Sequence, residues 1–201
     1  MTELNPRTIA YLLSLNGWCP EDKMQRLYKL VMDTKPDVIV ELGVWAGRSL
    51  FPMALALKEI GKGKAYGYDA WSNKVATEGT NNPADDEWWA KVDMEYILNC
   101  FKNSITFLWL EEWILWEQSK TDEAVTGFID NGIDIIHQDS AHNVETITLE
   151  LELWVPKLKS GGYLIVDDTD WEKAKPGYAK LPDHGLELVE DYVKWQIWKK
   201  Q

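Results

Sequence analysis

The chain has 201 residues, which is enough for one sizeable hydrophobic core and too few for two ordinary domains, so we expect a single domain over residues 1–201. Lys and Arg number 21 against 33 Asp and Glu, and the formal net charge of -12 argues against a nucleic-acid substrate and favours a small-molecule one. Two cysteines are too few for a disulfide framework and no apolar stretch is long enough for a membrane span, so we expect a soluble, cytoplasmic protein without a membrane partner.

The first third of the chain predicts an N-terminal helical cap, residues 1–35, followed by one βαβ unit. Apolar side chains at helical spacing over 22–33 indicate a helix that ends before Pro36. The β-branched run over 38–42 is typical of a parallel strand that is covered on both sides. The unit is completed by a helix and a second strand, over 49–60 and 65–68.

The rest of the chain alternates in the same way and ends in a hairpin. The polar stretch 71–86 predicts a loop over the site. The elements expected next are a helix over 88–107, a strand over 113–117, a short helix over 122–129, a strand over 133–137, a helix over 144–158, a strand over 162–166 and a hairpin of two β-rich runs, 186–193 and 195–198. This order predicts an α/β fold: a doubly wound, mostly parallel seven-stranded sheet with helices on both faces and an antiparallel C-terminal hairpin.

A turn that contains two glycines and a later acid together indicate a nucleoside site. Gly43 and Gly47 lie between the first strand and its helix, where bare backbone lets a ligand approach and free N–H groups point at an anion. Asp69 ends the second strand, where its carboxylate can accept hydrogen bonds from both ribose hydroxyls. The G-x-G-x-x-G pattern of dinucleotide sites is missing from the turn, which argues against a nicotinamide cofactor.

The turn over 41–47, with Asp69 after it, resembles the first motif and the ribose-binding acid of class I S-adenosylmethionine-dependent methyltransferases. The resemblance implies a Rossmann-like fold and S-adenosylmethionine as the cofactor. It also implies that Gly43 and Gly47 flank the methionine part and that Trp71 borders the adenine. The cofactor-binding residues expected on this basis are Glu41, Gly43, Gly47, Ser49, Asp69, Trp71 and Asp139.

Three carboxylates are predicted to meet at the carboxyl ends of the fourth and fifth strands. Asp139 follows the fourth strand, and Asp167 and Asp168 end the fifth, where neighbouring strands converge on the ligand crevice of a doubly wound sheet. Carboxylates this close together repel one another unless they are protonated or bridged by a cation. Oxygen ligands suit Mg²⁺, or less often Ca²⁺ or Mn²⁺. His142 follows three residues after Asp139 and is a candidate base near neutral pH.

The sequence around Asp139 and the later acidic pair is similar to the metal-dependent small-molecule O-methyltransferases related to macrocin O-methyltransferase. That resemblance implies that Asp139, Asp167 and Asp168 bind Mg²⁺ and that His142 deprotonates a substrate hydroxyl. Two positions depart from the family pattern: Ser140 replaces the usual glycine of its loop, and Asp167 has the shorter reach of the two acids found at its position.

The predicted reaction is therefore methyl transfer from S-adenosylmethionine to a hydroxyl of a small molecule, assisted by Mg²⁺ and catalysed by His142 and Asp139. Two alternatives stay open, a catalytically silent S-adenosylmethionine-binding subunit and a methyltransferase for a non-hydroxyl acceptor. A nucleotide-using oxidoreductase is disfavoured by the glycine spacing, and a homo-oligomer is left open.

The remaining histidines and the tryptophans give weaker signals. His137 and His184 are expected to be structural. Core packing is expected of most of the 12 tryptophans, but five of them could line an aromatic acceptor pocket or an oligomer interface. These five are Trp88, Trp89, Trp109, Trp113 and Trp116.

Overall fold

A computed structural model describes residues 3–79, 82–140 and 143–201 and confirms the predicted seven-stranded sheet. The strands are β1 Val38–Leu42, β2 Lys64–Asp69, β3 Ile114–Gln118, β4 Ile133–Gln138, β5 Leu158–Asp167, β6 Leu186–Asp191 and β7 Trp195–Lys200. Their order across the sheet is β3-β2-β1-β4-β5-β7-β6. β1 to β5 run parallel, while β7 pairs antiparallel with both β5 and β6, so the predicted C-terminal hairpin is also confirmed.

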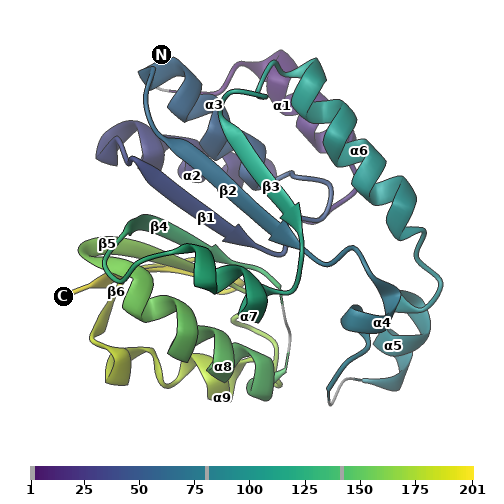
Figure 1. Ribbon diagram of the computed structural model, residues 1–201, viewed down its shortest axis with the longest axis vertical. Coiled ribbons are helices and arrows are strands. Elements are labelled where there is room, and N and C mark those ends of the chain that lie inside the picture. Colours follow the sequence, from purple (N-terminus) through teal and green to yellow (C-terminus); the bar gives the residue numbers. More distant parts are fainter. Residues whose placement is uncertain (1–2, 80–81, 141–142) are drawn as a thin grey trace.

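Helices cover both faces of the sheet (Figure 1). The α-helices are α1 Pro6–Ser14, α2 Glu21–Thr34, α3 Leu50–Ile60, α4 Asn73–Ala76, α5 Pro83–Trp89, α6 Met94–Phe107, α7 Thr121–Ala124, α8 Val144–Trp154 and α9 Lys175–Tyr178. Short 3-10 turns follow at Val125–Gly127, Val155–Lys157 and Leu181–His184. α3 and α6 lie on one face, and α7 and α8 lie on the other (Figure 1).

Alternate residues of the central strands contribute to two separate hydrophobic cores. Ile39 of β1 and Ile135 of β4 belong to the core under α2, α3 and α6. Their neighbours Val40 and Ile136 belong to the core that contains Trp154 of α8. Because successive side chains of a strand point to opposite faces, a strand buried on both faces is mostly apolar. The buried polar residues Glu41, His137 and Gln138 all lie near the carboxyl ends of β1 and β4.

The segment between β2 and β3 differs from its prediction. The predicted loop over 71–86 contains α4 and the start of α5, and the predicted helix over 88–107 is divided into α5 and α6. The side chain of Asp93 accepts a hydrogen bond from a backbone N–H of the first turn of α6 at 2.9 Å, and Asn73 donates to the carbonyl of Trp89 at the end of α5 at 2.7 Å. These side-chain caps end one helix and begin the next. α4 and α5 lie beyond the carboxyl ends of β1 to β3 (Figure 1).

The N-terminal helices precede the first strand and reach the sheet through α2. Asn5 caps α1 by accepting the N–H of Arg7 at 2.8 Å, and Pro6 occupies the first turn, where no backbone donor is needed. α2 packs beside α3, and its inner face carries Lys23 and Arg26 toward the second half of the sheet. Within the described residues, no helix has the length and apolar character to cross a membrane.

Candidate active site

A pocket of about 1010 Å³ opens at the carboxyl ends of the central strands. The strand order reverses between β1 and β4, and this switch point is where ligands bind in open α/β sheets. The predicted site residues that line the pocket are Gly43, Ser49, Asp69, Asp139, Asp167 and Asp168. The structure therefore brings the glycine turn and the strand-end acids to one cavity.

The glycine turn and the loop after β4 are pressed against each other. Gly43 has a φ of 84°, and a Cβ at this position would lie 2.6 Å from the Cα of Ser140. The N–H of Asp139 donates to the carbonyl of Leu42 at 2.8 Å, which extends the pairing of β1 and β4 by one residue. Gly43 is thus required both for its left-handed conformation and for the close approach of Asp139.

Asp69 is held by the main chain. Its Oδ2 accepts the N–H of Trp45 at 2.9 Å, and its Oδ1 accepts the N–H of Trp71 at 2.7 Å. Burial raises the pKa of Asp69, although these backbone hydrogen bonds oppose the shift. Each carboxylate oxygen has two lone pairs, so both oxygens keep acceptor capacity for a ligand hydroxyl. The carboxylate is fixed in the pocket wall before any ligand arrives.

Three predicted cofactor residues are not part of the described pocket lining. A Cβ at Gly47 would meet the rings of Phe51 and Phe101, so this glycine faces the core. The Trp71 indole stacks on Phe101 with ring centroids 5.5 Å apart and is 4% exposed. Glu41 is fully buried beside a histidine. The geometry gives these side chains structural contacts, and their predicted contact with the cofactor gains no support from it.

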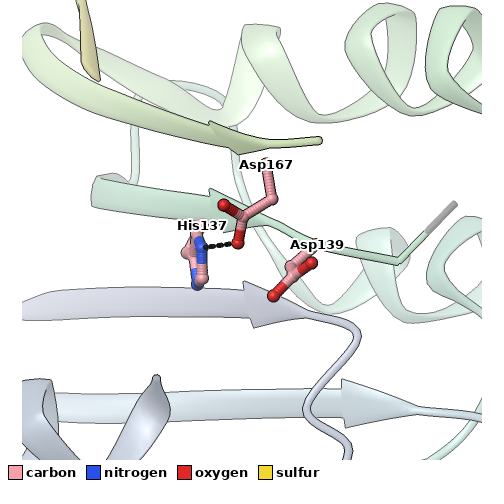
Figure 2. Close-up of side chains that lie close together, drawn as sticks. All are labelled: His137, Asp139 and Asp167. Carbon is pink, nitrogen blue, oxygen red and sulfur yellow. Dashed lines mark hydrogen bonds and ion pairs between the residues drawn. The ribbon is translucent and has the colours of Figure 1, made fainter. Parts of the chain in front are cut away.

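His137, Asp139 and Asp167 form a cluster at the ends of β4 and β5 (Figure 2). One potential ligand atom from each residue lies within 4.8 Å of the others. His137 Nε2 is 3.1 Å from Asp167 Oδ2, the contact dashed in Figure 2, and His137 Nδ1 is 2.6 Å from Glu41 Oε1. The sequence prediction of a structural role for His137 therefore missed its place beside the acids. Its spacing gave the signal, since residues two apart in a strand share a face.

Lys23 of α2 completes this cluster, and no motif in the sequence predicted its presence there. Its ammonium group forms an ion pair with Asp167 Oδ2 and lies 3.1 Å from His137 Nε2. The same group lies 5.5 Å from the ring centroid of Trp195, within the range of a cation–π contact. Lys23 is only 2% exposed, so the acid cluster contains a buried positive charge. We refer to Lys23, His137, Asp139 and Asp167 as the acid–lysine cluster.

The charges within the acid–lysine cluster shift one another's pKa values. Burial lowers the pKa of Lys23, but the carboxylates of Asp167 and Asp139 raise it to a net value above the ordinary one. Burial raises the pKa of Asp167, but Lys23 and the hydrogen bond to His137 hold it well below its usual range. Burial and the charge of Asp167 raise the pKa of Asp139 well above its usual range. Lys23 and Asp167 are therefore a charged pair at neutral pH.

The donor set of the acid–lysine cluster does not fit Mg²⁺ as the residues stand. Two of the three candidate ligand atoms, His137 Nε2 and Asp167 Oδ2, already contact the Lys23 ammonium. Mg²⁺ prefers oxygen ligands in near-octahedral geometry at about 2.0–2.1 Å, whereas one of the three members of the set is an imidazole. The predicted ligand Asp168 lines the pocket but is not part of this set.

Ser140, the residue that departs from the family pattern, anchors the loop after β4. Its hydroxyl donates to Glu150 Oε1 of α8 at 2.6 Å. Glu150 is 1% exposed and also accepts from Gln138 at 2.9 Å and Thr121 at 2.6 Å. Burial raises the pKa of Glu150, and these three donors oppose the shift. A buried carboxylate with this many donors fixes the loop that carries Asp139.

Four tryptophan rings form one wall of the pocket, and we call them the tryptophan cluster: Trp18, Trp45, Trp88 and Trp89. Ring centroids lie 5.6 Å apart for Trp18 and Trp45, and 4.8 Å apart for Trp88 and Trp89. Trp18 is 67% exposed although it belongs to this wall. Of the five tryptophans considered from the sequence, Trp88 and Trp89 line the pocket, whereas Trp109, Trp113 and Trp116 are not in its described lining.

The predicted base His142 lies outside the described residues, as does Ala141. The described residues on either side are firmly held. Asp139 continues the β1–β4 pairing, and Asn143 caps α8 by accepting the N–H of Thr146 at 2.9 Å.

Comparisons with known proteins agree with this architecture. A family model described as a methyltransferase domain matches residues 40–169, which include the glycine turn and the acids of β4 and β5. No curated protein matches the sequence.

Solved structures with the same fold have low sequence identity to this chain. The O-methyltransferase NovP is 16% identical, with a TM-score of 0.69 over 90% of this chain and 78% of its own. Cofactor-bound Rv0187 from MTB is 10% identical, with a TM-score of 0.69 over 97% and 90% of the two chains. An S-adenosylmethionine-dependent O-methyltransferase from Thermotoga maritima is 15% identical, with a TM-score of 0.64 over 96% and 69%. At these identities the likeness establishes the fold.

Proposed function

This chain belongs to the class I S-adenosylmethionine-dependent methyltransferase domains, and we propose that it transfers the methyl group to a hydroxyl oxygen of a small molecule. The observation that carries the proposal is the single pocket that joins the glycine turn to Asp139 and Asp167. A nucleoside on the turn and a nucleophile near the acids would then meet within one cavity. The solved relatives named as O-methyltransferases favour oxygen as the acceptor atom.

The cofactor is proposed to lie along the glycine turn. Asp69 would accept hydrogen bonds from the ribose hydroxyls, and the backbone at Gly43 would border the methionine part, with Ser49 nearby. Support for this orientation comes from Asp69, whose carboxylate is already fixed by two backbone N–H groups. A preformed acceptor pair loses little conformational entropy when the ribose binds.

The proposed reaction needs positioning and one proton acceptor. A lone pair of the hydroxyl oxygen attacks the methyl carbon, the carbon–sulfur bond breaks with its electrons left on sulfur, and S-adenosylhomocysteine leaves. The hydroxyl proton passes to a base, for which we propose His142, with Asp139 as the alternative. Holding the oxygen and the methyl group in line contributes most of the acceleration, because alignment removes the entropic cost of their encounter.

Magnesium, which the sequence predicts, enters no step of this proposal. Two of the side chains that could hold it, Asp167 and His137, are engaged by Lys23, so the reaction is written with the residues of the chain alone.

Residues 1–35 are proposed to act as a cap of the same domain. Support comes from α2, which contributes Lys23 to the pocket lining, and from Trp18 in the preceding segment, which belongs to the tryptophan cluster. Both residues place the N-terminal segment at the pocket.

Calorimetry with S-adenosylhomocysteine tests the cofactor site first, and a methyl-transfer screen of hydroxyl-bearing small molecules tests the reaction. Binding together with a methylated product is expected. Cofactor binding without transfer to any hydroxyl or amine acceptor would favour the catalytically silent subunit. Transfer only to amines or thiols would favour a methyltransferase for a non-hydroxyl acceptor.

The His142→Ala variant tests the base. Removing a general base lowers kcat by about 10²- to 10⁴-fold, while affinity for S-adenosylhomocysteine should stay near that of the unmodified chain. His184→Ala is the matched control, because His184 lies in the 3-10 turn Leu181–His184, outside the pocket lining. If both variants turn over at the same rate, His142 is not the base.

A further inference from the structure

We infer that the Lys23 ammonium is the permanent cation of the acid–lysine cluster, in the place that the resemblance assigns to a divalent metal ion. Methyl transfer by this chain accordingly proceeds without a bound metal. The second statement rests on the proposed function, whereas the first concerns the folded protein alone. The two can therefore fail separately.

The need for a cation follows from the topology. Parallel strands β4 and β5 bring Asp139 and Asp167 to the same edge of the sheet, and Glu41 lies behind them on β1. Carboxylates gathered in a buried space repel one another unless a positive charge lies between them. A metal-dependent relative supplies that charge with an ion from solution. In this chain the charge is covalently part of α2.

The position of Lys23 matches this role. It lies in the first turn of α2, its ammonium contacts Asp167 and His137, and the Trp195 ring lies 5.5 Å from it. A lysine is almost never this deeply buried unless it is paired, so its burial requires these partners. The helix is itself fixed beside α3, so the ammonium is delivered to the cluster by the packing of the fold.

A metal ion and Lys23 would compete for the same atoms. An ion coordinated by His137 Nε2 would take the lone pair that faces the ammonium 3.1 Å away. An ion bound to Asp167 Oδ2 would lie against the existing ion pair. Lys23 would have to leave, but its stem is enclosed at 3% side-chain exposure, and a displaced ammonium would lose its carboxylate partner.

Glu41 holds the His137 ring in the orientation in which it faces Lys23. Its Nδ1 lies 2.6 Å from Glu41 Oε1, and both side chains are fully buried. An ammonium group only donates hydrogen bonds, so His137 Nε2 accepts from Lys23 and Nδ1 carries the hydrogen directed at Glu41. Glu41, the first residue of the glycine motif, thereby orients the ring that faces the lysine. Lys23 itself is a positioning residue, because it acts on the site through Asp167 and His137.

The direct test is a Mn²⁺ titration of the unmodified protein, with and without S-adenosylhomocysteine. The electron paramagnetic resonance signal of free Mn²⁺ measures how much of the ion remains unbound. No stoichiometric binding is expected, and methyl transfer should be unchanged after treatment with EDTA. One tightly bound Mn²⁺ per chain would overturn the inference, as would EDTA inhibition that Mg²⁺ reverses. A protein that neither binds S-adenosylhomocysteine nor transfers methyl groups would refute the proposed function and leave the Mn²⁺ result to be read by itself.

The Lys23→Met variant sharpens the test, because methionine is uncharged and similar in length. Removing the ammonium frees His137 and Asp167, which lie beside Asp139, so the variant should bind Mn²⁺ and should melt at a higher temperature when Mg²⁺ or Mn²⁺ is added. A folded Lys23→Met variant that gains no Mn²⁺ affinity would contradict the assignment.

Two further variants complete the set. Lys29→Met, on the exposed side of the same helix, should bind no Mn²⁺ and show no metal-dependent change in melting. Lys23→Arg keeps the charge and should also bind no Mn²⁺, which gives a folded comparison where Lys23→Met is too unstable to purify. Mn²⁺ binding by Lys23→Arg equal to that of Lys23→Met would show that charge is not what excludes the metal.

Discussion

Asp69 and Asp167 both end parallel strands at the same edge of the sheet, yet they are held in opposite ways. Asp69 accepts hydrogen bonds from the backbone of residues 45 and 71. Asp167 accepts from the Lys23 side chain and lies 3.1 Å from His137 Nε2, and these two partners are 144 and 30 positions away in the sequence. One acid is fixed by a nearby turn, and the other by the packing of a distant helix.

The difference appears in their acid–base behaviour. Burial dominates for Asp69 and raises its pKa, whereas the buried ammonium and the histidine lower the pKa of Asp167. Neutral backbone donors fix the Asp69 carboxylate without balancing its charge, whereas the buried Lys23 ammonium balances the charge of Asp167. Position at a strand end therefore does not by itself define what an acid does.

Breaking the ion pair between Asp167 and the distant Lys23 should have the largest effect on stability. Asp167→Asn leaves the Lys23 ammonium buried without its carboxylate, and removing one member of a buried ion pair costs about 3–5 kcal/mol. Urea unfolding at neutral pH should show this loss relative to the unmodified chain. Asp183→Asn, an exposed acid in a 3-10 turn, is the control and should change stability by less than about 0.5 kcal/mol. Equal stabilities for the two variants would mean that the pair contributes little.

Changing Asp69, which is held by nearby backbone groups, should instead affect the affinity for the ligand. Asp69→Asn replaces a charged acceptor for the ribose hydroxyls by a neutral one, which should weaken binding of S-adenosylhomocysteine by about 10- to 100-fold. Calorimetry measures this loss, with Asp167→Asn as the internal comparison where it stays folded. Unchanged affinity in Asp69→Asn would show that the ribose does not bind this carboxylate.

The smallest effect on stability is expected at a second ion pair of α2, Arg26–Glu190. This pair is more exposed than Lys23–Asp167, so the two pairs test how burial changes the contribution of an ion pair. Arg26 Nε donates to Glu190 Oε2 of β6 at 2.8 Å, and the two side chains are 22% and 27% exposed. The hydrogen bond from Arg26 lowers the pKa of Glu190. Glu190→Gln should cost about 1 kcal/mol at neutral pH, because partly exposed pairs contribute less than buried ones.

The pH dependence of this pair has a defined sign. A lowered folded-state pKa means that the pair stabilises the fold above the unfolded value for Glu, about 4.3, and that the contribution is lost as pH falls through the folded value. The stability difference between the unmodified chain and Glu190→Gln should therefore be largest near pH 7 and shrink below about pH 4. A difference that grows on acidification would contradict the assignment.

Local patterns were sufficient to predict most of the fold. Mostly apolar strands, glycine turns and helical spacing follow from neighbouring residues, so β1, β4 and the hairpin agree with their predictions, while β5 begins at Leu158, before the strand predicted over 162–166. The segment over 71–107 did not, because α5 and α6 are separated by side-chain caps such as Asp93, and these compete with a continuous helical pattern.

The sequence by itself determined that the glycine turn and Asp69 meet Asp139 and Asp167 at one pocket, since strand order and motif spacing are local or topological properties. Only the tertiary structure decided that Lys23 joins those acids, that His137 faces them, and that Trp71 packs in the core. The physical reason is that burial and charge pairing depend on which distant surfaces pack together, and no spacing along the chain encodes the approach of an ammonium group 144 residues away from its carboxylate.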